Sequence, residues 1–436
     1  MTVDEKENEQ LAIAGAMHSL MTELYPICRS ITGNGVRQTL SMLADVIPLK
    51  VKEVPSGTNV FDWTVPDEWN VNEAWVKDPA GDKIIDFAEH NLHLMSYSVP
   101  LRKTMSLDAL KPHLHTLPAQ PELIPYRTSY YSKNWGFCVP HKQLEALPEG
   151  DYEIYIDSTL QPGALSYGEF IIPGKVDKEV LVFSHLCHPS LANDNLSGLV
   201  VNSFLARQLA ESDNFYTYRF VFAPGTIGSI TWLATNEALL PRVHCGLVSV
   251  LLGGDNRFTY KKSRTGNAEI DDIVPFVLEE LDQPYDAIDF EPYGYDERQF
   301  GSPGIALDVG RLTRAPNNQF PEYHSSADNL AFVSKESLTE SLATLNRIIQ
   351  ILDANRTYIN LNSKCEPQLG KRGLYAAMGG EHIREQEHAI LWVLNQSDGK
   401  STLLDITHRS KLPFDMLAEA ADRLVSAELI AIANSS

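Results

Sequence analysis

Cysteines, long apolar runs and a basic leader are scarce or missing in this sequence of 436 residues. Its cysteines are scattered and odd in number, which favours reduced thiols over a disulfide framework. They are Cys28, Cys138, Cys187, Cys245 and Cys365. No stretch approaches the roughly 20 consecutive apolar residues of a membrane span. Residues 1–10 are acidic and polar, unlike a signal peptide. We therefore expect a cytoplasmic protein without a membrane segment.

Positive charge is scarce as well. Lysine and arginine number 36 against 57 aspartates and glutamates, which gives a formal net charge of -21. This balance opposes nonspecific binding to nucleic acid and favours solubility, but it does not identify a substrate. Hydrophobic residues make up 43% of the chain, enough for an ample core. The length predicts two or three domains.

One loop of the sequence concentrates groups that bind metals. Residues 179–183 are short, β-branched and aromatic, which predicts a buried strand. His185, His188 and Asp194 follow, and apolar residues then recur at helix spacing. A strand, a polar loop and a helix place that loop at the carboxyl edge of a sheet, where open α/β folds bind ligands. Imidazole and carboxylate are ligands that zinc prefers.

A second loop supports the first. His324 is followed four residues later by Asp328, directly before a helical stretch that starts near Ser334. Between the two loops, residues 293–300 form a polar segment and residues 301–307 enter another predicted strand. The two histidine loops together predict a metal site.

The order and content of these loops resemble the zinc-dependent aminopeptidase family, which includes bacterial leucyl aminopeptidases, glutamate carboxypeptidase and glutaminyl cyclase. The resemblance covers roughly residues 170–355. His185 matches the family's strand-end histidine, and Asp194 matches its metal-bridging aspartate. His324 matches the final histidine, and Asp255 best matches the aspartate of a second metal. The resemblance implies zinc, with one ion expected and a second left open.

The whole chain more closely resembles a bacterial branch of that family that is often linked to polysaccharide biosynthesis. This resemblance implies an α/β fold, with a zinc-exopeptidase-like mixed sheet flanked by helices, an inserted β-rich domain and a C-terminal winged helix. We predict an aminopeptidase-like domain over residues 1–47 and 174–360 and the inserted domain over residues 48–173. The winged helix is predicted over residues 375–436.

The acids of one family motif are missing. The family usually places a Glu-Glu pair before Gly-Ser at the next strand end, where one glutamate is the general base and the other a zinc ligand. Residues 223–229 contain no acid, and Gly225 stands where the closer branch leads us to expect a glutamate. Without that carboxylate, a metal loses a ligand and the attacking water loses its base.

The remaining roles stay open between alternatives. Glu297 and Glu322 are the candidates for the catalytic base, although Glu322 could be a solvated loop acid. Asp296 could orient a metal ligand without itself contacting the metal, or it could form an ion pair with Arg298. Either His185 or His188 could be the metal ligand beside Asp194 and His324.

Cys187 stands where the wider family often has an aspartate. It could be a ligand, a redox-sensitive thiol or, in the favoured interpretation, a small buried residue.

The predicted insertion is rich in tryptophan, with Trp63, Trp69, Trp75 and Trp135 among its short β-like runs. Such side chains can grip sugars or peptides near a cleft by stacking, but they more often fill a small β core. We favour the core.

The tail resembles a winged helix. Three helices are predicted over residues 385–394, 401–406 and 413–427, the second capped by Ser401, with a wing at residues 429–431. The last helix is the candidate for reading DNA. It carries three acids beside Arg423, whereas helices that enter a DNA groove normally carry basic residues; the acids are Asp415, Glu419 and Asp422. We therefore favour a packing or protein-contact module.

Two functions follow from this sequence. The first is a metal-dependent, aminopeptidase-like hydrolase of amide bonds that acts on a small amino-acylated, peptide or amino-sugar substrate. The alternative is a noncatalytic protein that kept the fold and some metal ligands, lost the base, and binds a ligand or partner. Nucleic acid and membranes are not expected as partners, and association with copies of the chain stays open.

Overall fold

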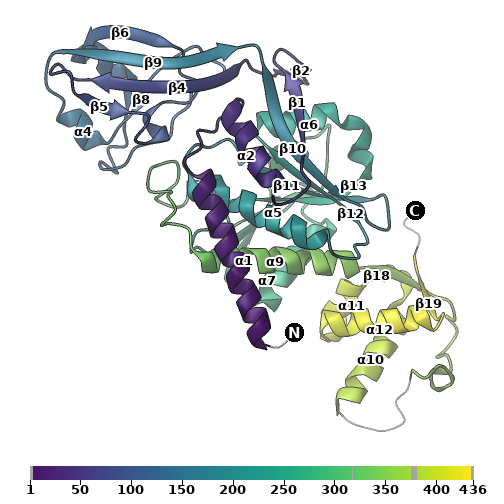
Figure 1. The fold of residues 1–436 in the computed structure, drawn as a ribbon. Helices are drawn as coiled ribbons and strands as arrows, with labels where there is room; N and C mark the ends of the chain where they lie inside the picture. Colours follow the sequence, from purple (N-terminus) through teal and green to yellow (C-terminus); the bar gives the residue numbers. More distant parts are fainter. Residues whose placement is uncertain (1–2, 317, 375–380, 434–436) are drawn as a thin grey trace. The chain divides into compact units, whose positions relative to one another are not determined.

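A mixed sheet of eight strands organises residues 1–346 (Figure 1). The structure is a computed structural model that describes residues 3–316, 318–374 and 381–433. Residues 1–346 form one compact unit and residues 347–436 another. In spatial order the strands of the large sheet are β1 (Lys50–Pro55), β10 (Ala164–Ile172), β12 (Thr217–Ala223), β11 (Glu179–His185), β13 (Val243–Ser249), β16 (Val309–Thr313), β14 (Phe258–Lys261) and β15 (Tyr285–Ile288).

The centre of this sheet is parallel and its flanks are mixed. Strand β11 pairs in parallel with β12 and β13, and β13 pairs in parallel with β16. Strands β1, β10 and β14 each join the sheet through antiparallel pairs. Helices pack on this sheet, so the predicted α/β fold with a mixed sheet flanked by helices is confirmed.

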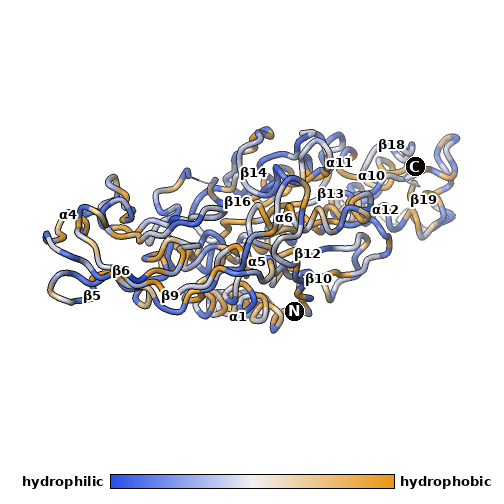
Figure 2. Tube along the Cα trace, turned by 90° about the horizontal axis from the view of Figure 1, so that it is seen from above, coloured by the Kyte–Doolittle hydropathy of each residue, from blue (hydrophilic) through white to orange (hydrophobic). Residues whose placement is uncertain are grey.

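Strand β11 is the predicted buried strand, extended by two residues to His185. All seven of its residues are buried, as are all seven of β12. Near-continuous burial is typical of parallel strands covered on both faces. Figure 2 shows orange, hydrophobic stretches of the chain in the region of β12 and β13.

The crossovers between parallel strands create a crevice at one edge of the sheet. Helix α5 (Gly198–Leu209) connects β11 to β12, its neighbour on one side in the sheet. Helix α6 (Ile227–Thr235) lies in the connection from β12 to β13, which is the neighbour of β11 on the other side. Because such crossovers are right-handed, α5 and α6 cover opposite faces. The loops that leave β11 and β12 therefore diverge, and this is where open α/β sheets bind ligands.

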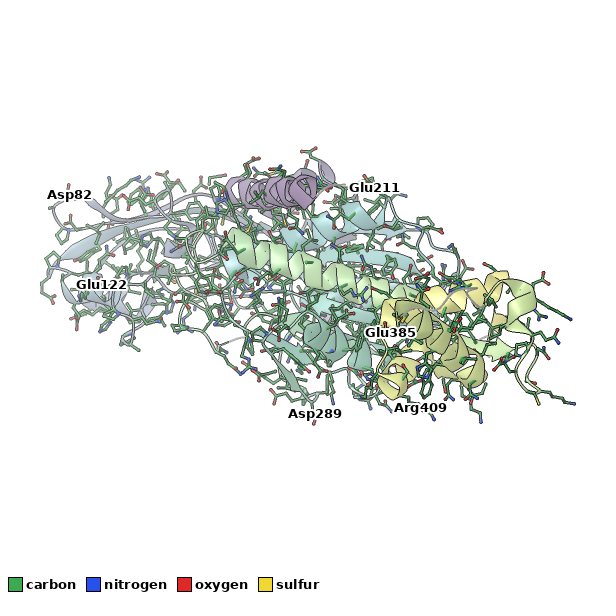
Figure 3. All side chains as sticks on the ribbon, turned by 90° about the horizontal axis from the view of Figure 1, so that it is seen from below. Asp82, Glu122, Glu211, Asp289, Glu385 and Arg409 are labelled. Atoms are coloured by element: carbon green, nitrogen blue, oxygen red, sulfur yellow. The ribbon has the colours of Figure 1, made fainter. Side chains whose placement is uncertain are left out.

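The other helices complete the layers. Helix α1 packs on α5, α2 packs on β1 and β10, and α7 packs on β13 and β16. The bounds of these helices are α1 (Val3–Leu24), α2 (Asn34–Ala44) and α7 (Glu269–Glu280). Two further helices are α8 (Glu297–Phe300) and α9 (Lys335–Ala354). Asp82, Glu122, Glu211 and Asp289 are exposed acids of this unit and point outward in Figure 3. Among the described residues, every helix is too short or too polar to span a bilayer.

A second, antiparallel sheet lies within the predicted insertion. Its spatial order is β5 (Lys83–Asp86), β4 (Glu68–Lys77), β9 (Asp151–Gln161) and β6 (Leu101–Ser106). Two short strand pairs accompany it: β2 (Asn59–Val60) with β3 (Trp63–Thr64), and β7 (Leu114–His115) with β8 (Phe137–Cys138). Its short helices are α3 (Leu107–Leu110) and α4 (His141–Glu145). Strands β1 and β10 also fall within residues 48–173, yet they pair with the large sheet. The domain division itself stays a prediction.

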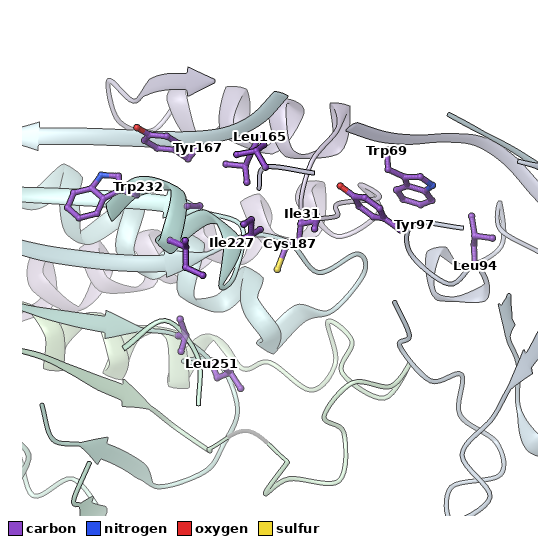
Figure 4. Close-up of a cluster of buried hydrophobic side chains, with 14 of the residues drawn as sticks. Ile31, Trp69, Leu94, Tyr97, Leu165, Tyr167, Cys187, Ile227, Trp232 and Leu251 are labelled. Atoms are coloured by element: carbon purple, nitrogen blue, oxygen red, sulfur yellow. The ribbon is translucent and has the colours of Figure 1, made fainter. Parts of the chain in front are cut away.

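One hydrophobic cluster joins the second sheet to the large one. It contains Trp69 and Ile154 from the second sheet and Phe183 and Trp232 from the α/β layers. Figure 4 shows Trp69, Trp232 and their neighbours in this cluster. Trp69 and Trp75 are buried, as the core interpretation predicts, whereas Trp63 is exposed.

In residues 347–374 and 381–433 the structure shows the end of α9, a three-stranded sheet and three further α-helices. The sheet has the order β18 (Asp398–Thr402), β17 (Thr357–Asn360) and β19 (Ile430–Ile432). The helices are α10 (Glu381–Gln396), α11 (Leu403–Ser410) and α12 (Phe414–Ser426). The predicted cap of the second helix is wrong, because Thr402 accepts the N–H of Asp405 at 3.1 Å while Ser401 lies in β18. A helix begins where a side chain satisfies its free N–H groups.

Candidate metal centre

The carboxylate of Asp194 faces three imidazoles at the end of β11. Its Oδ1 lies 2.7 Å from Nε2 of His185 and 3.3 Å from Nδ1 of His188. Its Oδ2 lies 3.0 Å from Nε2 of His324. Asp194 and His185 are fully buried and His188 is 6% exposed, whereas the His324 side chain is 31% exposed. His324 is thus the member of the group most open to solvent.

The chain fixes these groups through its backbone. His185 is the last residue of β11, and Asp194 lies in the segment Ala192–Ser197 that leads into α5, where the backbone of Asp194 itself is non-helical. The amide of Asn195 donates to the carbonyl of His185 at 2.9 Å and accepts the N–H of Leu251 at 2.9 Å. The loop after β11 is therefore tied to its own strand and to the end of β13.

Asp328 holds the same turn from the other side. Its carboxylate accepts the N–H of Asn193 at 2.6 Å and that of Asp194 at 2.9 Å, and its carbonyl accepts the N–H of Ala192 at 3.0 Å. Burial raises the pKa of Asp328 to about 7, against the two N–H donors. The His324 loop, which contains Asp328, is thereby fastened to the Asp194 turn.

The donor set fits a zinc ion. Ligand atoms of His185, His188 and Asp194 all lie within 4.8 Å of one another. Nitrogen and oxygen ligands at about 2.0–2.2 Å from a tetrahedral zinc ion are roughly 3.3–3.6 Å apart. The 3.3 Å between His188 and Asp194 is of this size, whereas the 2.7 Å and 3.0 Å from Asp194 to His185 and His324 are hydrogen-bond distances. Nδ1 of His185 and Nδ1 of His188 are buried without a hydrogen-bond partner. Nδ1 of His188 lies 3.3 Å from Oδ1 of Asp194 without making a hydrogen bond, as expected of a metal ligand, whereas His185 faces Asp194 through Nε2.

The charges of this group are strongly coupled. Burial alone would raise the pKa of Asp194, but the imidazoles of His188, His185 and His324 outweigh it and hold that pKa well below its usual value. Burial lowers the pKa of His188 to about 3. A carboxylate that stays ionised beside a neutral imidazole has the protonation state that a cation needs in its ligands.

Tyrosine rings enclose the imidazoles. Tyr295 stacks on His185 with ring centroids 4.8 Å apart, and Tyr323 stacks on His324 at 3.8 Å. Tyr126 meets His324 edge to face at 5.1 Å. The hydroxyls of Tyr295 and Tyr323 are hydrogen-bonded to each other, and that of Tyr295 donates to Oδ2 of Asp194 at 3.3 Å. The rings fix the imidazole planes and exclude water from one side of the carboxylate.

The end of β12 brings a strained turn and no acid. Thr226 has φ 62° and ψ -70°, and the N–H of Ile227 donates to the carbonyl of Gly225 at 2.8 Å. This is a γ-turn with positive φ, which is rare and strained, above all for a β-branched residue. Asp296 stabilises it, because its Oδ1 accepts the N–H of Thr226 at 2.8 Å and the hydroxyl of Ser229 at 2.6 Å.

Position 225 has room for a side chain. A Cβ added to Gly225 would meet Sγ of Cys187 at 3.4 Å and Cβ of His185 at 3.7 Å, which are ordinary contacts. The N–H of Gly225 donates to Sγ of Cys187 at 3.3 Å. Burial raises the pKa of Cys187 to about 12, so this thiol is a neutral, buried residue, as the favoured interpretation predicts.

The acids predicted around residue 296 occupy different surroundings. Asp296 is buried with Oδ2 unpartnered, and it binds Thr226 and Ser229 rather than Arg298. Burial raises its pKa, and the neighbouring His185 opposes that rise. Glu297 is fully buried, with its carboxylate 3.0 Å from Lys261 and 3.1 Å from Arg311.

Two further predicted residues lie differently. Glu322 is half-buried in the His324 loop, and in the described part of the chain its carboxylate has no hydrogen-bond or ion-pair partner. Asp255 is exposed after β13 and is not part of the group formed by His185, His188 and Asp194. A second metal would need an acid directly after β13. The residues at that place are the apolar Val250 and Leu251.

A cavity of about 320 Å³ opens beside this group. It is lined by Ile31, Tyr126, Arg127, Thr128, Tyr130, Cys187, His188, Gly225, Thr226, Tyr295 and His324. Tyr295 lies in the polar segment 293–300 that the sequence places between the two histidine loops, whereas Tyr126, Arg127 and Tyr130 were not predicted, because their segment is distant from both loops in sequence. The segment Tyr126–Tyr130 carries an unusual density of aromatic residues, which was the one available signal.

Solved structures reproduce the fold. A zinc aminopeptidase from Bacillus subtilis matches with a TM-score of 0.57 and 15% identity, over 78% of this chain and 95% of that one. At this identity the match concerns the fold alone, which is that of the zinc aminopeptidases.

Closer relatives match the full length. A model of the family described as a domain of unknown function (DUF4910) matches residues 18–355, and a winged helix-turn-helix model matches residues 356–432. The chain belongs to the DUF4910 family. It is 51% identical over 417 residues, 95% of this chain and 96% of the other, to a Clostridium acetobutylicum protein named "Putative polysaccharide biosynthesis protein with aminopeptidase-like domain". A crystal structure of a "putative peptidase" from that organism matches with a TM-score of 0.91 and 49% identity over 99% of both chains.

Proposed function

We propose that this protein is a metal-dependent hydrolase of amide bonds, of the aminopeptidase type, that acts on a small amino-acylated, peptide or amino-sugar substrate. One observation carries the proposal: the buried carboxylate of Asp194 faces the imidazoles of His185, His188 and His324 beside a cavity at the divergence of two crossovers. The name of the Clostridium acetobutylicum relative supports a substrate from polysaccharide biosynthesis.

His185, His188 and Asp194 would hold one zinc ion, and His324 would complete the site on the other oxygen of Asp194. A second ion stays part of the proposal as an open position, for which the exposed Asp255 is the predicted ligand. Bound zinc supplies polarisation of the scissile carbonyl and a lower pKa of water. The chain's own residues do the positioning.

Asp328 orients the Asp194 turn by accepting two of its N–H groups, and Asn195 fixes the loop against β13. The tyrosine rings hold the imidazoles and exclude bulk water, which strengthens every electrostatic interaction inside the cavity. Such outer contacts decide the orientation of metal ligands.

The proton-transfer role stays with the two predicted glutamates, and their surroundings differ. Lys261 and Arg311 both contact Oε1 of Glu297, and its Oε2 accepts the N–H of Tyr295 at 3.2 Å. Glu322 stands two residues before His324 and has no hydrogen-bond or ion-pair partner among the described residues, although it is not among the residues that line the cavity. We propose Glu322 as the base ahead of Glu297.

The alternative function is a noncatalytic protein that binds metal or ligand on the same fold. The observation in its favour is that the residues lining the cavity, all within the described part of the chain, include no carboxylate, and that Gly225 stands at the end of β12. Metal binding and hydrolysis therefore have to be measured separately.

We also propose that the winged helix contacts protein rather than DNA. Helix α12 exposes Asp415, Glu419 and Asp422, which would repel phosphates. A cytoplasmic location and association with copies of the chain belong to the same set of proposals.

A direct test measures hydrolysis of aminoacyl 4-nitroanilides by the native protein, with zinc and after removal of metal by a chelator. The hydrolase proposal predicts zinc-dependent release of 4-nitroaniline that falls about 10²–10⁴-fold in Glu322→Gln. Zinc binding with no release by the native chain would favour the alternative.

A further inference from the structure

The loop that carries His188 is held by a segment that lies far from it in the sequence. Residues 24–29 begin at the end of helix α1. Nε of Arg29 donates to the carbonyl of His188 at 2.9 Å, and the hydroxyl of Ser190 donates to the carbonyl of Tyr25 at 3.0 Å. The N-terminal segment is therefore bonded to this loop at two points.

Arg29 has surroundings that are unusual for a charged side chain. It is 1% exposed, and its Nη1 donates to the carbonyl of Leu24, the last residue of α1, at 2.7 Å. Its Nη2 is buried without a hydrogen-bond partner, and among the described residues no carboxylate forms an ion pair with this guanidinium. The negative end of the helix dipole offsets only part of the charge. Burial of a charge without a counter-charge opposes folding, so the fold carries a cost at Arg29 that a neutral side chain would not have.

The loop that Arg29 contacts has a strained backbone. Ser190 has φ 44°, which is uncommon for a residue with a side chain, and Pro189 restricts the backbone of His188 before it. Such geometry persists where surrounding contacts over-determine it. Because the carbonyl and the imidazole of His188 belong to one residue, a bond that fixes the carbonyl also limits where the imidazole can point. That imidazole is the one whose Nδ1 lies 3.3 Å from Oδ1 of Asp194 without a hydrogen bond.

The neighbours of Arg29 and His188 connect this contact to the cavity. Ile31 and Cys187 both line the cavity and belong to one hydrophobic cluster, which Figure 4 shows. Arg29 itself is not among the lining residues. It therefore reaches a ligand in the cavity through His188 and not directly.

We propose that Arg29 is a positioning residue of the metal centre: it fixes the carbonyl of His188 and thereby holds the imidazole where it binds the ion. Arginine suits this role because Nε and Nη1 of its planar fork reach two different carbonyls, which a single ammonium group does not. The inference rests on the proposed function for the metal, but it is tested by metal affinity and by the mobility of the loop, and not by turnover.

Two substitutions test the role in the full-length protein. Arg29→Gln removes the charge and most of the fork, whereas Arg29→Lys keeps the charge alone. Competition with a chelator measures zinc affinity, which we expect to fall by about 10–100-fold in Arg29→Gln and by less in Arg29→Lys. Hydrogen exchange of residues 186–191 in the zinc-free protein should become faster in both variants. Arg29→Lys decides the question where Arg29→Gln fails to fold.

Arg219→Gln is the matched control. Arg219 is also a buried arginine, but it lies on β12 outside the cavity lining and pairs with Glu169 at 2.5 Å and Glu179 at 2.6 Å. Its loss leaves two buried carboxylates without their counter-charge, which lowers the free energy of unfolding at a different place. Zinc affinity and the exchange of residues 186–191 should stay within about twofold of the native values.

Zinc affinity within about twofold of the native value in both Arg29 variants would overturn the inference while the metal centre stands. An equal loss of affinity in Arg219→Gln would overturn it as well, because general destabilisation would then explain the effect. A native chain that binds no zinc would remove the metal centre and this role with it. Zinc binding that depends on Arg29, in a chain that hydrolyses no anilide, would contradict the hydrolase proposal and support the role of Arg29.

Discussion

The ends of β11 and β12 meet at the same cavity, yet they carry different chemistry. The end of β11 brings His185, His188 and Asp194, and their loop is tied by side-chain and backbone hydrogen bonds. The end of β12 brings Gly225 and Thr226, with a strained turn and no carboxylate. Ligands for a metal and a base for catalysis are thus separable properties of one fold.

The difference also shows in how each end is supported. The turn of Asp194 is braced by Asp328, whereas the turn at Thr226 is braced by Asp296 through one carboxylate oxygen, with the other oxygen unpartnered. Strained backbone persists where surrounding contacts over-determine it, and such positions gather at active sites. The geometry at β12 is thus kept although the acid is absent.

The substitution Gly225→Glu would give the end of β12 the carboxylate that it lacks. A Cβ fits at position 225 with ordinary contacts, so the new carboxylate can reach the cavity without displacing backbone. A general base contributes about 10²–10⁴-fold, and we expect release of 4-nitroaniline from aminoacyl anilides to rise by that order.

Gly225→Gln is the matched control, because it has the same size without the basic oxygen. A rise of equal size in both variants would show that the side chain acts by shape and not as a base.

Substitution by glutamine also distinguishes the two predicted bases, Glu297 and Glu322. Glu297→Gln would leave Lys261 and Arg311 buried without their counter-charge, so we expect the free energy of unfolding to fall by about 3–5 kcal/mol. Glu322→Gln should change it by less than about 0.5 kcal/mol and act on turnover instead. Denaturant titration and initial rates separate the two; a loss of rate without loss of stability in Glu297→Gln would make Glu297 the base.

The brace of the β11 end is tested by Asp328→Asn. The new amide N–H₂ would oppose one of the N–H groups of Asn193 and Asp194, which Asp328 accepts in the native chain. We expect zinc affinity to fall about 10–100-fold, measured by competition with a chelator. Unchanged affinity would mean that the turn holds its shape without this carboxylate.

The smallest effect is expected away from both strand ends. Hydrogen bonding to Arg37 lowers the pKa of Glu68 from 4.5 to about 2. A carboxylate with a depressed pKa stabilises the fold above its ordinary pKa, and that contribution is lost as the pH falls from about 4.5 to 2. Glu68→Gln should therefore lower the free energy of unfolding by about 1 kcal/mol at pH 7 and by little near pH 2. An equal loss at both pH values would contradict this assignment.

The sequence predicted the β11 end well, because its signals are local. Strand, loop and helix follow one another within residues 179–209, and His185, His188 and Asp194 lie inside that span. The helices of the C-terminal tail and the burial of Trp69 and Trp75 were likewise predicted from local patterns.

What the sequence did not predict depends on pairing over long distances. Strands β1 and β10 join the large sheet from within the predicted insertion because their partners are set by packing and not by neighbours in the chain. Tyr126 lines the cavity because its N–H pairs with the carbonyl of His324, almost 200 residues away in the chain. The surroundings of Glu297 depend on Lys261 and Arg311, which come from two other strands.

The central claim is that the β11 end binds a metal. Elemental analysis of native protein purified without added metal, beside Asp194→Asn, measures this directly. The account predicts about one zinc ion per chain in the native protein and none in the variant, whose neutral amide keeps the size of Asp194 but not its charge. No metal in the native protein, or equal metal in both, would contradict it.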